Sequence, residues 1–284
     1  MKSYLKMIGL FILLVIIHQG LAFIYLVPFA TYYALIGIEG EALEQLIYAQ
    51  SVNAIIFSGL GALLVFLIMF SARKKGLIER SRFHKITFKQ AGWSAAIGFS
   101  FVFFSLLVVQ WMSIMFPVQY ASFLEKMEIL VDAPMITVFI AVVIVAPLFE
   151  EIMFRGIVYD ALSKKMNIII SIIIAGLLFG IYHMNIFQGT YATLIGITMG
   201  FSLVWTKSIW APIIIHFVNN LLSFLLSYSV IGAWLDTEKA LPIILCIVIV
   251  VTILPFSIYK LSQTYEKPIP MEELEQIIEL DPIV

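Results

Sequence analysis

Eight apolar segments of about membrane-spanning length dominate this chain. Its 284 residues are 62% hydrophobic and 12% charged, whereas a soluble protein is about 45–50% apolar and about 25% charged. A helix needs roughly 20 mostly apolar residues to cross a bilayer, and its backbone groups must be satisfied within the segment. We therefore predict an all-α, polytopic membrane bundle that forms one integral domain over residues 1–284. The predicted spans are approximately 8–30, 52–72, 91–114, 135–155, 168–186, 190–206, 209–229 and 241–261.

Basic residues alternate between the two sets of connections. The only basic residues in the connections on one side of the predicted bundle are Lys126 and Lys239. The connection after the second span, on the other side, carries Arg73, Lys74, Lys75, Arg80, Arg82, Lys85 and Lys89. Because cytoplasmic loops are enriched in Lys and Arg, we predict that both termini are cytoplasmic, with residues 264–284 forming an acidic cytoplasmic tail. The net charge of −1 gives no electrostatic case for nucleic-acid binding.

Three charged residues lie within or at the edge of the fourth apolar segment. Each charge at mid-bilayer costs roughly 2.5–3.5 kcal/mol on insertion scales, so their presence indicates a function. Glu151 and Arg155 are four residues apart and share a helix face, which predicts an ion pair. Glu150 is rotated about 100° away and stays available. Pro147 removes a backbone hydrogen bond and is expected to kink this helix.

Further polar side chains lie on the fifth and seventh spans. His183 follows Phe179 by four residues, and His216 precedes Asn220 by four, so each pair shares a helix face. A single intramembrane His or Asn is usually a packing or hydrogen-bonding residue, as we expect for His18 in the first span. Polar groups in lipid must nevertheless find one another. We therefore predict that the charged residues of the fourth span, His183, His216 and Asn220 form one cluster.

The three patterns Glu150-Glu151-x-x-x-Arg155, Phe179-x-x-x-His183 and His216-x-x-x-Asn220 occur in order, each on a predicted span. Together they resemble the CPBP family of intramembrane proteases, which includes the CAAX prenyl endopeptidases. The resemblance covers a catalytic core of about residues 135–228. It implies an eight-helix bundle, a cavity reached from the cytoplasmic side, and endopeptidase activity on a peptide or membrane-protein substrate.

Two mechanisms fit these residues. In the first, Glu150 is the general base for a water that His183 positions, while His216 and Asn220 stabilise the oxyanion. The Glu151–Arg155 pair then holds the helix in place. In the second mechanism, Glu150, His183 and His216 bind zinc, which activates the water. We favour the first mechanism, without a cofactor, because the resemblance implies it and because a side-chain amide suits an oxyanion hole.

The predicted span boundaries place Glu150 and His183, the two ends of this cluster, at different depths in the membrane. Glu150 lies near the inner end of a fourth span that stops at residue 155. At about 1.5 Å per residue, His183 lies some 20 Å above the inner end of the fifth span. A single cluster therefore predicts that the fifth span begins later, with residues 160–171 forming an interfacial helix.

Two other functions remain open on the sequence. Intramembrane Glu, His and Arg also build proton relays, so a proton-coupled transporter is one alternative. A non-proteolytic bacteriocin-immunity or scaffold protein is the other. For each of the three functions we expect an integral protein of a bacterial cell membrane. The sequence does not indicate the substrate or the oligomeric state.

Overall fold

The computed structural model describes residues 2–235 and 239–265, and these residues form only helices and their connections. Most of the predicted acidic tail therefore lies outside the described residues. Helices occur at all eight predicted span positions. The helices are α1 (Lys2–Leu35), α2 (Gly40–Ser71), α3 (Leu77–Ser81), α4 (Phe88–Met115), α5 (Pro117–Asp132), α6 (Met135–Val138), η1 (Phe139–Val145), α7 (Ala146–Glu151), η2 (Ile152–Tyr159), α8 (Asp160–Ser163), α9 (Ile168–Tyr182), α10 (Ile186–Thr206), α11 (Trp210–Ser227), α12 (Val230–Leu235) and α13 (Ala240–Ser262).

Six of the described helices are long and apolar enough to cross a membrane. They are α1, α2, α4, the continuous helix Met135–Ser163, α11 and α13. The other two predicted spans are weaker on these criteria. Helix α9 is apolar but has only 15 residues, and the 21 residues of α10 include Gln188 and several threonines. The chain is thus an all-helical bundle of the polytopic membrane type, as predicted.

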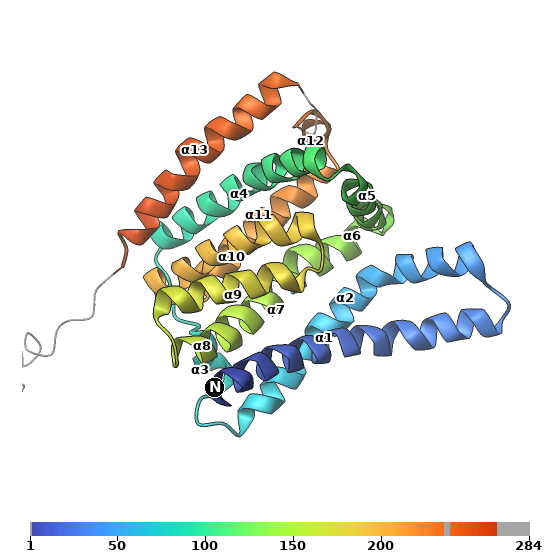
Figure 1. The fold of residues 1–284 in the computed structure, drawn as a ribbon, viewed down its shortest axis with the longest axis horizontal. Helices are drawn as coiled ribbons and strands as arrows, with labels where there is room; N and C mark the ends of the chain where they lie inside the picture. Colours follow the sequence, from blue (N-terminus) through green and yellow to red (C-terminus); the bar gives the residue numbers. More distant parts are fainter. Residues whose placement is uncertain (1, 236–238, 266–284) are drawn as a thin grey trace, which may run out of the picture.

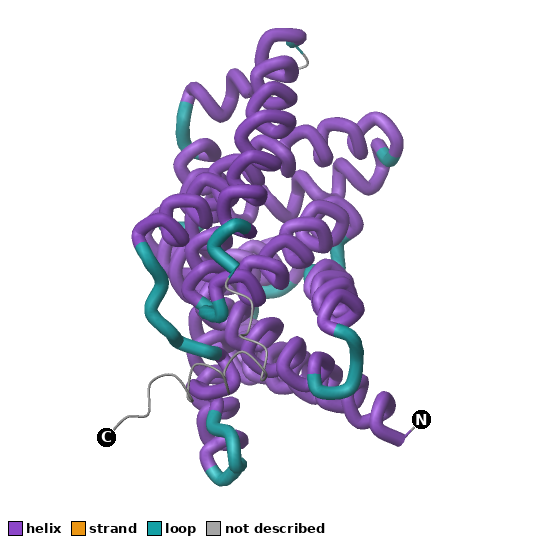
Figure 2. Tube along the Cα trace, turned by 90° about the vertical axis from the view of Figure 1, so that its left-hand side faces the viewer, coloured by secondary structure: helices purple, strands orange, loops and turns teal. Residues whose placement is uncertain are grey.

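The other long helices pack around the segment Met135–Ser163, some with their neighbours in sequence and some with distant helices. Helix α1 packs on α2, α9 on α10, and α4 on both α11 and α13. Figure 1 shows α1 and α2 as a long antiparallel pair, whose loop end diverges from the other helices. The view turned by 90° also shows helices joined by short loops (Figure 2). The main core cluster includes Phe149, Met153 and Phe154, so the segment that carries the predicted charges is also the structural centre.

Small residues bring α9 and α10 into close contact. A Cβ atom added at Gly176 would lie 2.5 Å from Ile197, and one added at Gly200 would lie 2.8 Å from Ile172. At Gly196 an added Cβ would lie 3.0 Å from Phe179 and 3.4 Å from Arg155. The small-residue pair Gly196 and Gly200 therefore has the packing role expected of it in a membrane helix.

The expected late start of the fifth span is wrong. Helix α9 begins at Ile168, and residues 160–163 continue the preceding helix as α8. The fourth helix instead extends eight residues beyond the predicted end, from residue 155 to Ser163. Glu150 therefore lies about 20 Å from the Ser163 end, and His183 lies at a similar distance from Ile168. A longer fourth helix, rather than a shorter fifth one, brings the two residues to one depth.

Candidate active site

The helix that carries Glu150 and Glu151 contains two π-helical segments, η1 and η2, on either side of α7. Within η1 the N–H of Ala146 bonds to the carbonyl of Ala141, five residues earlier. The next bond in this register would join residue 147 to Val142, but Pro147 has no N–H. The side-chain amide of Asn220 supplies the missing donor, with its Nδ2 atom 2.8 Å from the Val142 oxygen. Such π-helical segments often occur at functional sites.

Glu151 and Arg155 form the ion pair that their spacing predicts. Arg155 Nε lies 3.0 Å from Glu151 Oε2, and the two side chains are 2% and 0% exposed. Arg155 also donates through Nη2 to the carbonyl of Gly196 at 2.8 Å. Its guanidinium lies 4.8 Å from the centre of the Phe179 ring. Arg155 thus joins the helix of the two glutamates to α9 and α10, because only close helix packing at Gly196 lets the guanidinium reach that carbonyl.

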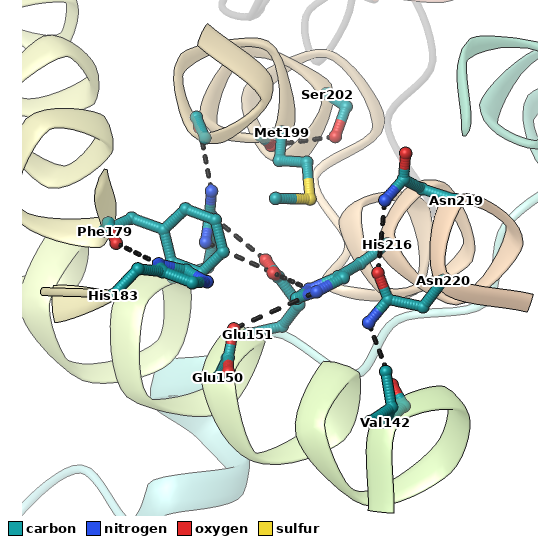
Figure 3. A network of polar contacts seen from close by, with 12 residues as sticks. Val142, Glu150, Glu151, Phe179, His183, Met199, Ser202, His216, Asn219 and Asn220 are labelled. Atoms are coloured by element: carbon teal, nitrogen blue, oxygen red, sulfur yellow. Dashed lines mark hydrogen bonds and ion pairs between the residues drawn. The ribbon is translucent and has the colours of Figure 1, made fainter. Parts of the chain in front are cut away.

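His216 lies between the two carboxylates (Figure 3). Its Nδ1 atom is 2.8 Å from Glu151 Oε1, and its Nε2 atom is 3.9 Å from Glu150 Oε2. The first contact is a hydrogen bond and fixes a proton on Nδ1, since an ionised carboxylate only accepts. The second distance is too long for a direct hydrogen bond. Glu150 Oε2 accepts no hydrogen bond from any described residue, although it is buried. The sequence predicted that His216 joins the cluster, but not that Glu151 would hold it.

His183 is placed by the end of α9. It is the C-cap residue of that helix, and the next residue, Met184, adopts a left-handed backbone conformation with φ of 48°. The Nδ1 atom of His183 lies 2.8 Å from the carbonyl oxygen of Phe179. That oxygen can only accept, so Nδ1 carries the proton, and Nε2 is an acceptor in the neutral ring. The Phe179 ring packs edge-on against both His183 and His216.

Two adjacent asparagines lie on the α11 side of the site. Asn219 donates through Nδ2 to Asn220 Oδ1 at 3.1 Å, and Asn220 in turn donates to Val142. This chain orients the Asn220 amide, which keeps a second N–H. The sequence does not predict the roles of Asn219, the Val142 carbonyl or the Gly196 carbonyl. An Asn-Asn pair within an apolar span was the available signal for Asn219, whereas no sequence pattern identifies a particular backbone carbonyl.

The three proposed zinc ligands, Glu150, His183 and His216, do not form a metal-binding set in this arrangement. Among the described residues, no group of three or more His, Cys, Asp or Glu side chains is gathered closely enough to hold a metal ion. The Nδ1 atoms of His216 and His183 contact Glu151 and the Phe179 carbonyl, a feature that zinc ligands share, so the spacing of the three side chains is what decides against a zinc site. The arrangement therefore does not fit a His₂Glu zinc site without movement of side chains.

A second polar network lies behind the site. His18 of α1 is 2.8 Å from the Tyr182 hydroxyl through Nδ1 and 3.0 Å from Ser58 through Nε2. Its ring also stacks on Phe149, the neighbour of Glu150, with centroids 4.5 Å apart. Both ring nitrogens thus have partners, which confirms the prediction that His18 is a satisfied interior histidine. This network connects α1, α2 and α9 next to the site.

Comparisons with known proteins give two matches and one negative result. Residues 132–222 match the family model of "Type II CAAX prenyl endopeptidase Rce1-like". The chain is also 32% identical over 96 residues to a Bacillus subtilis (strain 168) protein described as "Putative membrane peptidase YdiL". That alignment spans 34% of this chain and 39% of the relative. No solved structure matches the chain significantly.

The matched region contains every residue of the cluster, from Val142 on η1 to Asn220 on α11. On this basis residues 132–222 form a domain of the Rce1-like type II CAAX prenyl endopeptidase family.

Proposed function

We propose that this chain is an intramembrane endopeptidase that hydrolyses a peptide bond of a membrane-associated peptide or protein. The observation that carries the proposal is the position of Glu150. Its Oε2 atom is buried and accepts no hydrogen bond from a described residue, while the side chain as a whole is 13% exposed. It lies 3.9 Å from the Nε2 atom of His216, whose other nitrogen is bonded to Glu151. A general base needs a carboxylate oxygen that no other side chain occupies, and Glu150 provides one.

Glu150 accepts a proton from the attacking water in this proposal. His183 supplies a second acceptor for the same water, because the Phe179 carbonyl holds its proton on Nδ1. A water that donates one hydrogen to Glu150 and the other to His183 directs its lone pairs toward the scissile carbonyl. The proton passes to Glu150 as the new C–O bond forms, and Glu150 then delivers it to the leaving amine.

His216 and Asn220 stabilise the tetrahedral oxyanion. His216 donates through Nε2–H while Glu151 holds Nδ1–H, and Asn220 donates through the amide hydrogen that Val142 does not use. With both nitrogens of His216 protonated, the formal charges of Glu150, Glu151, Arg155 and His216 sum to zero. A neutral set of buried charges costs less than an unbalanced one in a low-dielectric site. Removing one donor from an oxyanion hole costs about 10²–10³ in rate.

The test compares the peptides in membranes that contain the wild-type protein or Glu150→Gln. The amide is nearly isosteric but cannot act as a base, so we expect cleavage products to disappear and uncleaved precursors to accumulate. Glu44→Gln is the control, because Glu44 is an exposed carboxylate far from the site in sequence. Products that persist at wild-type levels in Glu150→Gln membranes, but are absent without the protein, would contradict the role of Glu150.

A further inference from the structure

A cavity of about 530 Å³ lies near the Ser163 end of the helix that carries Glu150. There α3 and the α10–α11 turn meet η2 and α8. It is separate from the proposed active site, since none of the polar residues of that site lines it. Its lining residues are Lys75, Ile78, Glu79, Arg82, Phe83, His84, Asp160 and Lys207.

Two positive charges of this cavity have no acidic partner. Asp160 is paired with Arg80 at 2.6 Å and with Lys164, and Glu79 is paired with Lys75 at 3.4 Å. Within the described residues, no carboxylate forms an ion pair with Arg82 or Lys207. The acidic side chains of the cavity are therefore already neutralised, and Arg82 and Lys207 give it a net positive charge.

The backbone holds these two cations in place. The carbonyl of Arg82 accepts a hydrogen bond from the N–H of Ile209, and the carbonyl of His84 accepts one from the Ser208 hydroxyl. The Arg82 guanidinium lies 5.5 Å from the centre of the Tyr159 ring. Arg82 and Lys207 are the C-cap residues of α3 and α10, and both have the left-handed backbone with which helices commonly end, with φ of 56° and 55°.

Apolar side chains complete the cavity. Ile78, which is 66% exposed, and Phe83 lie beside the basic groups. An exposed apolar residue next to basic ones is typical of a segment at a membrane surface. The basic connection 73–89 is also the one that the distribution of Lys and Arg predicts to be cytoplasmic, where anionic lipids gather.

We propose that this cavity binds a phosphate group, as presented by the headgroup of an anionic phospholipid. Arg82 and Lys207 contact the phosphate oxygens, His84 lines the same side, and Ile78 and Phe83 contact the start of the acyl chains. Soluble inorganic phosphate shares the chemistry of the charged group but cannot use the apolar part of the cavity. The proposal is independent of the proposed proteolytic activity.

Native mass spectrometry of the detergent-purified full chain tests this proposal with phosphatidylglycerol and phosphatidylcholine of the same acyl chains. The pocket variant is Arg82→Asn with Lys207→Asn, because Asn tolerates the left-handed backbone better than most residues and removes the charge. The control is Arg73→Asn with Lys74→Asn. It removes one Arg and one Lys from exposed positions outside the cavity.

We expect the wild-type protein to prefer phosphatidylglycerol and the pocket variant to lose about 30-fold in affinity, or roughly fivefold for each basic side chain. The control should stay within about threefold of wild type. Equal losses in both variants, or no preference for phosphatidylglycerol in the wild-type protein, would overturn the proposal. The thermal unfolding midpoint of the pocket variant should be at or above that of the control, which shows that the loss of lipid binding is not caused by unfolding. If the double variant unfolds, lipid binding is measured with Lys207→Asn alone.

Inorganic phosphate, added at increasing concentration, distinguishes the two sources of the group. Displacement of phosphatidylglycerol at low millimolar phosphate supports a site that recognises the phosphate itself. Retention of the lipid at tens of millimolar supports a site that needs the acyl chains as well. Binding of neither probe to the cavity, judged by identical behaviour of wild type and pocket variant, excludes both.

Discussion

At the scale of single residues, the site is organised by His216 and its two carboxylates. Glu151 holds Nδ1 and also pairs with Arg155, so one buried carboxylate serves two partners. Glu150 faces the other nitrogen without a direct hydrogen bond. Adjacent glutamates thus have different tasks because a helix turns about 100° between neighbours. Glu151 stabilises the packing of the helices, and Glu150 is available to accept a proton.

The Glu151–Arg155 pair gives a prediction about stability. Glu151→Gln leaves the guanidinium of Arg155 buried without a carboxylate, which costs about 3–5 kcal/mol when a buried pair is broken. We expect a lower thermal unfolding midpoint and a lower yield of folded protein. Arg155→Met should be similarly destabilising. The double variant should be more stable than the sum of the two effects predicts, and simple additivity of the two changes would show that the pair is not coupled.

The choice of mechanism gives a prediction about metal. Since proton transfer is assigned to Glu150, we expect purified protein to remain active after treatment with a strong chelator. Elemental analysis should give far less than one zinc per chain. A His₂Glu zinc enzyme would instead lose activity with its metal and regain it when zinc is added. That combination, with stoichiometric zinc, would replace the general-base mechanism by the metal-assisted one.

At the scale of elements, the π-helical turn before Glu150 and the side chain of Asn220 compensate for Pro147. Pro147 has no N–H to donate to the Val142 carbonyl, and the side-chain amide of Asn220 on α11 donates to that carbonyl instead. This contact ties the helix that carries Glu150 to the helix that carries His216. The spacing between Glu150 and His216 therefore depends on a hydrogen bond that lies about two turns from Glu150 and about one turn from His216.

A double-mutant cycle tests this compensation. Asn220→Ala leaves a buried carbonyl without a donor, which should cost about 1–3 kcal/mol of stability. In a Pro147→Ala background the restored N–H at residue 147 can bond to the helix, so the same change should cost less. Thermal unfolding in detergent measures the stability cost of Asn220→Ala in the wild-type and Pro147→Ala backgrounds. An equal cost of Asn220→Ala in the two backgrounds would mean that Asn220 does not substitute for the missing N–H.

At the scale of the whole molecule, the helices form a bundle whose basic connections lie on one side in the predicted topology. We propose that this side, with both termini, faces the cytoplasm. The cavity at Arg82 and Lys207 then lies at the cytoplasmic surface, and Glu150 lies about 15 Å deeper than the cavity residue Asp160 along the same helix. Substrate chains would have to reach that depth before cleavage.

Cysteine accessibility tests this orientation. In a Cys246→Ala background, a cysteine at Glu44 should react with an impermeant reagent from outside, and one at Lys74 should react only after the membrane is opened. Both positions are exposed in the structure. Asp236, a third predicted outer position, lies outside the described residues. A Lys74 cysteine that reacts in intact cells would reverse the topology.

The sequence by itself determined the helical membrane class, the eight helix positions and the set of polar side chains. Apolar length and helix-face spacing are local properties, so the Glu151–Arg155 pair could be predicted from four-residue spacing. The extent of the fourth helix could not, because the helix continues past Arg155 to Ser163, where η2 packs against α3 and α9 and α8 packs against α9.

Only the tertiary structure decided which polar groups meet. The bond from Glu151 to His216 joins residues 65 positions apart, and that from Asn220 to Val142 joins residues 78 apart. Each depends on how closely α9, α10 and α11 approach the Glu150 helix. Small residues such as Gly196 allow that approach, but a glycine does not specify which side chain will use the space. The sequence therefore predicts the members of the site, and helix packing decides the contacts among them.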